Sequence, residues 1–149
     1  MIKNILVAVD GSENSERALD FALDLADRYN APLTVLNVSE SPAIGAVPLE
    51  PTSISGDTLT LFSKELRVLH EDILKKAVAH AKELNPKVEV TSKLREGDPA
   101  SEIVAEAKES GFDVVVVGHR GASRVKEIFL GNISEKVSHL APCPVIIVR

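Results

Sequence analysis

Four consecutive valines, residues 114–117, constrain the fold of this chain more than any other feature of its sequence. Gly118 ends the run. A short strand that is apolar at every position is typical of a parallel sheet covered by helices on both faces, whereas a strand with one solvated face alternates apolar and polar residues. The valine run therefore predicts an α/β protein.

Strand patterns and helix patterns alternate along the rest of the chain. Strands are expected at residues 2–9, 33–38, 87–94, 114–117 and 145–148. Helical periodicity follows Ser12 and Asp98, which are predicted N-caps, and also begins at Thr58 and after Gly131. Because crossovers between parallel strands are right-handed, this order predicts one domain over residues 1–149, a Rossmann-like, doubly wound sheet of five parallel strands with the first strand near its centre.

Residues 39–57 interrupt this alternation. They contain three prolines and two glycines and show no periodicity. The segment follows the carboxyl end of a strand, which is where α/β proteins bind ligands. It is interpreted either as a lid over a ligand site or as a tolerated insertion.

A pattern of glycines follows the valine strand. Gly118 and Gly121 bracket a polar turn, and nine residues then separate Gly121 from Gly131, which precedes a helical pattern. Glycine lets the main chain approach an anion closely, and a helix N-terminus favours negative charge. Arg120 adds a guanidinium group suited to phosphate. The pattern predicts an anion-binding site, and solvated loop charges are the alternative.

Asp10 stands at the carboxyl end of the first predicted strand, directly before Gly11. An acidic residue in this place can accept hydrogen bonds from ribose hydroxyls, as it does in dinucleotide-binding folds. The alternative is that Asp10 only forms the turn that leads into the first helix.

Several classes of protein are disfavoured by composition. A net charge of −5 argues against a nucleic-acid-binding surface, and the sequence has no apolar run as long as a membrane span. The chain enters its first strand without a signal peptide, and the single cysteine, Cys143, fits a reducing compartment, so a cytoplasmic location is expected. His70 and His80 are expected to be surface residues.

Four pieces of the sequence, in this order, resemble the universal stress protein family: residues 5–12, 97–100, 118–131 and 143–148. The resemblance covers the whole chain. It implies strand order 3-2-1-4-5 and an adenine nucleotide, ATP or AMP, that lies across the carboxyl ends of the first and fourth strands, with Mg²⁺ accompanying ATP.

The resemblance also implies roles for individual residues. Asp10 would face the ribose and Val38 the adenine. The phosphates would be surrounded by Gly118, Gly121, Gly131, Asn132 and Ser134, and the remaining members of the predicted site are Val9, Gly11, Arg120 and Ile133. Asn132 departs from the Ser or Thr usual in the nucleotide-binding branch: it keeps an amide donor but lacks a hydroxyl that can also touch a metal.

These features favour a nucleotide-binding regulatory protein of the stress response. The strand at 145–148 is apolar and is an edge strand in the implied order, so a homodimer through it is expected. Two alternatives stay open: an enzyme with slow ATP hydrolysis or nucleotidyl transfer, for which no Gly-Lys-Ser/Thr element is present, and a nucleotide-free structural dimer. The sequence does not name a protein partner.

Overall fold

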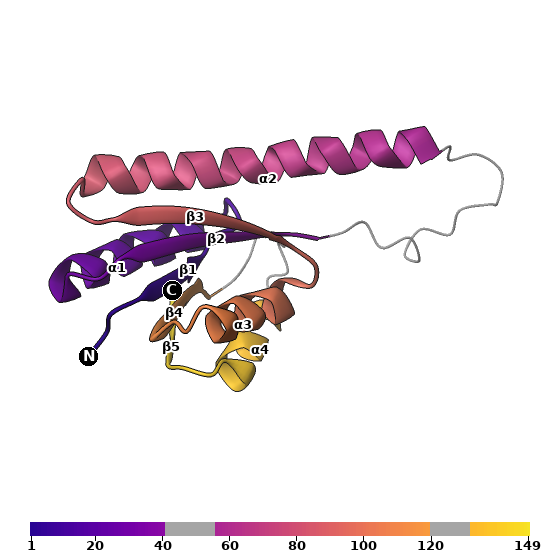
Figure 1. The fold of residues 1–149 in the computed structure, drawn as a ribbon. Coiled ribbons are helices and arrows are strands. Elements are labelled where there is room, and N and C mark those ends of the chain that lie inside the picture. The colour runs from indigo at the N-terminus through magenta and orange to yellow at the C-terminus, as the bar shows by residue number, and fades with distance from the viewer. Residues whose placement is uncertain (41–55, 120–131) are drawn as a thin grey trace.

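The computed structural model describes residues 1–40, 56–119 and 132–149 (Figure 1). Along the chain the elements are β1 (Ile5–Ala8), α1 (Glu13–Tyr29), β2 (Leu33–Ser39), α2 (Gly56–Leu84), β3 (Val90–Glu96), α3 (Pro99–Glu109), β4 (Val114–Gly118), α4 (Asn132–Leu140) and β5 (Val145–Val148). This is the predicted alternation of strands and helices, and the N-caps Ser12 and Asp98 are also confirmed.

Two strands begin later than the sequence suggests. The main-chain N–H groups of Lys3 and Asn4 donate to the Asp113 carboxylate, at 2.7 and 3.0 Å, and β1 begins at the next residue. Residues 87 and 88 belong to a turn in which their N–H groups donate to Asn85, so β3 begins at Val90.

Within the described residues, the strands form one five-stranded parallel sheet in the order β3-β2-β1-β4-β5. Ile5 of β1 pairs with Leu33 of β2 on one side and with Val114 of β4 on the other. The predicted fold class, the strand order and the central place of the first strand are therefore confirmed.

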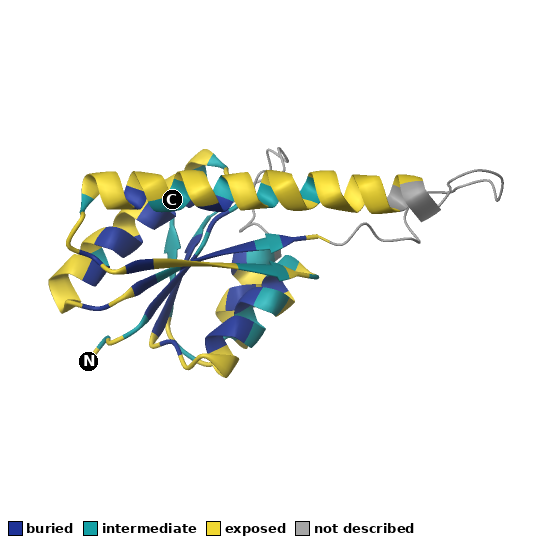
Figure 2. Cartoon of the chain, turned by 45° about the horizontal axis from the view of Figure 1, so that its top comes forward, coloured by how far each residue is buried: buried dark blue, intermediate teal, exposed yellow. Residues whose placement is uncertain are grey.

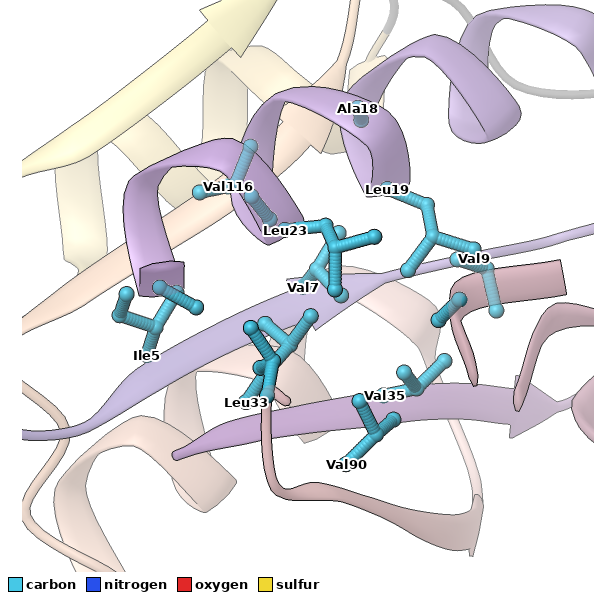
Figure 3. Close-up of a cluster of buried hydrophobic side chains, with 14 of the residues drawn as sticks. Ile5, Val7, Val9, Ala18, Leu19, Leu23, Leu33, Val35, Val90 and Val116 are labelled. Carbon is cyan, nitrogen blue, oxygen red and sulfur yellow. The ribbon is translucent and has the colours of Figure 1, made fainter. Parts of the chain in front are cut away.

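The helices form a layer on each face of the sheet. Ile5 and Val7 of β1 point toward α1 and α2 (Figure 3), whereas Leu6 packs in the opposite layer with α3 and α4. The side chains of β4 also alternate between the two layers: Val116 packs in the layer of α1 and α2, and Val117 packs in the layer of α3 and α4. A strand covered on both faces needs an apolar side chain at every position, which explains the valine run.

Helix α2 is longer than the sheet that it covers. Its C-terminal half is anchored by Leu74 and Ala81, which are buried, whereas its N-terminal half extends past the strands in Figures 1 and 2. Phe62, Leu69 and Leu84 share one helical face by sequence but are 50%, 55% and 55% exposed. Among the described residues, no helix is both long enough and apolar enough to cross a membrane.

An ion cluster joins the edge strand β3 to α3. The carboxylate of Glu106, 1% exposed, accepts hydrogen bonds from Lys93 Nζ at 2.9 Å, Arg95 Nη1 at 2.8 Å and Ser110 Oγ at 2.7 Å. Burial raises the pKa of Glu106, but these hydrogen bonds outweigh burial and hold the pKa below its usual value. A buried charge is tolerated where it is paired and hydrogen-bonded in this way.

The first turn of α1 packs directly on the end of β4. A Cβ atom added to Gly118 would lie 2.8 Å from the carbonyl carbon and oxygen of Asn14 and 3.1 Å from the nitrogen of Ser15. These are main-chain atoms, which cannot turn aside as a flexible side chain would. Glycine at 118 therefore sets the distance between the strand and the helix.

We expect Glu106→Gln to lower the free energy of unfolding by about 2 kcal/mol at pH 7, because charge-assisted hydrogen bonds are lost in a buried place. The folded-state pKa of Glu106 lies below the ordinary value of 4.5, so its stabilisation is present above that pH and is lost as the pH falls below it. Urea denaturation at pH 7 and pH 3 should therefore show a smaller difference for the variant than for the wild type.

The matched control is Glu109→Gln. Glu109 also binds Arg95, at 2.9 Å, but its side chain is 61% exposed, so a smaller loss of stability is expected. Equal losses in the two variants would show that burial of Glu106 adds nothing to the cluster.

Gly118→Ala should lower the free energy of unfolding by about 2 kcal/mol, because the added methyl group overlaps the Asn14 main chain. Chemical denaturation measures this loss. Gly111→Asn is the control: a Cβ at 111 would have no atom within 4 Å, and asparagine tolerates the φ of +65° there. An unchanged denaturation midpoint for Gly118→Ala would contradict the packing argument.

Candidate functional site

The candidate site lies where β1 and β4 end. Val9 extends the pairing of β1 by donating its N–H to the Leu36 carbonyl at 2.8 Å. The chain then leaves the sheet through Asp10 and Gly11, which has a φ of +81°. Glycine adopts this left-handed conformation without strain, so it suits a turn that must reverse direction within two residues.

Asp10 organises the turn into α1. Its Oδ1 accepts the N–H of Ser12 at 2.9 Å, and its own N–H donates to Ser15 Oγ at 3.2 Å. Ser12 in turn caps α1 by accepting the N–H of Ser15 at 3.2 Å. The turn-forming role of Asp10 is therefore present in the structure, and its contact with a ribose stays a prediction.

The end of β4 contacts the first turns of two helices. Gly118 lies against Asn14 of α1, and the carbonyl of the next residue, His119, accepts a hydrogen bond from Ser134 Oγ of α4 at 3.1 Å. Ser134 is 2% exposed, and Ile133 beside it packs in the α3–α4 layer. These contacts bring the N-termini of α1 and α4 to the same edge of the sheet.

Val38 lies at this edge on β2, where it pairs in register with Arg95 of β3. The Arg95 guanidinium is engaged by Glu102 at 2.6 Å and by the carboxylates of Glu106 and Glu109. Hydrogen bonds to these carboxylates raise the pKa of Arg95 above its usual value. Arg95 is thus held by the carboxylates of the ion cluster, although it lies beside Val38 at the edge of the candidate site.

The described members of the predicted site gather at one edge of the sheet: Val9, Asp10, Gly11, Val38, Gly118, Ile133 and Ser134. Three other predicted members, Arg120, Gly121 and Gly131, lie outside the described residues, as do the side chain of Asn132 and residues 41–55 of the predicted lid. Their roles stay predictions.

Sequence inspection missed a hydrogen-bonded pair behind this edge. Asn37 is 1% exposed in the middle of the apolar strand β2, and its Oδ1 lies 2.6 Å from Nδ1 of His70 on α2. His70 is half-buried, so its expected place as a surface residue is wrong, because α2 turns this ring toward the sheet. Asn37 itself could have indicated this pair, because a polar side chain in the middle of a buried strand requires a hydrogen-bonding partner.

In the described part of the chain, no group of three or more His, Cys, Asp or Glu side chains is placed to hold a metal ion. What the described residues bring together at this edge is the N-termini of two helices, a feature that favours negative charge.

Comparisons with known proteins place the chain in a family. The model of the universal stress protein family matches residues 1–149. Universal stress protein YxiE of Bacillus subtilis is 38% identical over 154 aligned residues, covering all of both chains.

Solved structures agree with this match. The structure of UspA from Lactobacillus plantarum is 25% identical with a TM-score of 0.83 and covers 99% of this chain and 98% of its own. A universal stress protein crystallised in complex with cAMP is 26% identical with a TM-score of 0.72 and covers 99% of this chain and 97% of its own. The chain is therefore a member of the universal stress protein family.

Proposed function

We propose that this chain is an adenine-nucleotide-binding regulatory protein of the stress response and that ATP or AMP binds at the carboxyl edge of the sheet. One observation carries the proposal: the end of β4 is flanked by the N-termini of both α1 and α4. Helix N-termini carry partial positive charge and N–H groups that favour phosphate. The cAMP complex of a similar protein supports the same ligand class.

The nucleotide is proposed to lie along this edge, with its adenine at one end and its phosphates at the other. Asp10 accepts hydrogen bonds from the ribose, Val38 contacts the adenine, and the main chain at Val9 and Gly11 lies beside them. The phosphates lie toward the start of α4, near Gly118, Arg120, Gly121, Gly131, Asn132, Ile133 and Ser134. Mg²⁺, where it accompanies ATP, would be held mainly by the phosphates.

Binding rather than catalysis is proposed as the activity. The sequence contains no Gly-Lys-Ser/Thr element beside the glycine pattern. Ser134 donates its hydroxyl proton to the His119 carbonyl, so its side chain holds α4 against β4. In this proposal, nucleotide binding alters the surface through which the chain contacts a protein partner.

Asp10→Asn should weaken AMP binding about tenfold, because a charge-assisted hydrogen bond to the ribose is replaced by a neutral one. Asparagine keeps an oxygen for the Ser12 N–H, so the turn into α1 is preserved. Isothermal titration with AMP measures the loss, and titration with adenine, which lacks the ribose, should give equal affinities for the variant and the wild type.

Asp24→Asn serves as the control. Asp24 is also on α1, but it is exposed and pairs with Arg28 of the same helix at 2.9 Å, so AMP affinity should be unchanged. A wild type that binds neither ATP nor AMP would refute the proposed function. Equal AMP affinity for wild type and Asp10→Asn would place the ribose elsewhere.

The chain is further proposed to act as a homodimer through β5. Val145–Val148 is apolar and only partly buried along its whole length, whereas the opposite edge strand, β3, carries exposed polar and charged residues. Polar edges resist pairing and apolar edges favour it. A twofold axis beside β5 would join two copies in an antiparallel arrangement through one self-complementary surface.

Ile146→Lys should shift the protein from dimer to monomer, because it places a charge in the middle of the paired edge. Sedimentation velocity measures the shift, with circular dichroism to show that the variant is folded. Ser92→Lys adds the same charge to β3 at the other edge and should leave the dimer intact. A monomeric wild type would contradict the proposal.

A further inference from the structure

The buried Asn37 side chain connects two parts of the molecule that are far apart in sequence. Its Nδ2 lies 2.6 Å from the carbonyl oxygen of Val9, at the end of β1. Its Oδ1 lies 2.6 Å from Nδ1 of His70, on α2. One amide group thus bridges the start of the candidate site and the helix that covers this face of the sheet.

The chemistry of the three groups determines how the bridge is protonated. A carbonyl oxygen can only accept, so the amide nitrogen of Asn37 must face Val9 and the amide oxygen must face His70. The amide oxygen can also only accept, so Nδ1 of His70 must carry a proton. The orientation of the amide and the tautomer of the ring therefore specify each other.

The bridge completes the attachment of Val9 to β2. The Val9 N–H donates to the Leu36 carbonyl at 2.8 Å, and the Val9 carbonyl accepts from the side chain of the following residue of β2, Asn37. The next residue along the chain is Asp10, where the main chain leaves the sheet. The main-chain N–H and C=O groups of Val9 are thus both hydrogen-bonded to β2, one residue before Asp10, the proposed ribose contact.

We propose that Asn37 is a positioning residue of the nucleotide site and that His70 makes α2 part of the same unit. Neither residue needs to touch the ligand: Asn37 fixes Val9 and hence the direction in which Asp10 leaves the strand, and His70 fixes Asn37. This inference rests on the proposed function for its ligand, but the hydrogen-bonded bridge itself exists without one. A site held in this way loses affinity when either member of the bridge is removed.

The first experiment needs no nucleotide. At pH 8, where ordinary histidines are neutral, the ¹⁵N shifts of the ring should show His70 with its proton on Nδ1. His80 provides an internal comparison, because its Nε2 lies 2.7 Å from Asp20 Oδ1 and should carry the proton instead. A His70 ring protonated only on Nε2 would overturn the bridge.

The second experiment follows the Val9 amide in the apo protein. In His70→Leu and Asn37→Leu, hydrogen exchange at the Val9 N–H should quicken at least about tenfold relative to that at Val7, because the carbonyl side of Val9 is released. His70→Asn keeps an amide N–H near the Nδ1 position and should restore slow exchange. Unchanged Val9 exchange in both leucine variants would overturn the positioning role, whether or not nucleotide binds.

The third experiment measures AMP affinity by titration calorimetry. His70→Leu should bind AMP about tenfold more weakly, a change comparable to one hydrogen bond, and His70→Asn should recover to within about twofold of the wild type. His80→Leu removes the other histidine contact of α2 and should bind like the wild type. Equal affinity for His70→Leu and wild type, or no recovery in His70→Asn, would overturn the inference.

A wild type that binds no AMP and no ATP would refute the proposed function instead. In that case the positioning role of Asn37 and His70 would be tested by the His70 tautomer and by hydrogen exchange at the Val9 N–H. The two failures are therefore distinguishable.

Discussion

The pairing of main-chain groups in a sheet buried on both faces is the constraint on which the rest of this structure depends. Each buried N–H and C=O group of β1 and β4 must find a partner, and parallel neighbours provide one on both sides. Parallel pairing also places the carboxyl ends of all the strands at one edge. The helices that return the chain between strands begin at that edge, so helix N-termini gather there before any ligand is considered.

The two outer strands meet this constraint differently. β3 leaves one side unpaired but carries Lys93 and Arg95, whose charges are taken up by Glu106 beneath it. β5 has no such cluster in its apolar segment and is covered only in part by α1 and α4. The sheet therefore has one edge strand that carries charged residues and one that is apolar.

The sequence predicted the elements whose signals are local. The valine run and the N-caps Ser12 and Asp98 each depend on neighbouring residues, and the structure confirms all of them. The strand order came from the family resemblance, because pairing between distant segments leaves little trace in local patterns.

The sequence could not show contacts between residues that lie far apart along the chain. The contact of Asn37 with His70 joins residues 33 positions apart, and the clash that excludes a side chain at 118 involves the main chain of Asn14. The apolar stripe of α2 has helical spacing throughout, but spacing cannot tell where the sheet beneath it ends. Phe62, near the start of α2, fits the pattern of a buried face and is nevertheless exposed.

The contact at Gly118 has a consequence for how such sequences diverge. The atoms that exclude a larger residue at 118 belong to the main chain of Asn14, so a change of the side chain at 14 would not make room for one. A related sequence with the same helix packing but no ligand would meet the same steric limit at this position. Within the glycine pattern, this first glycine therefore indicates a helix packed closely on a strand, whether or not a ligand is bound.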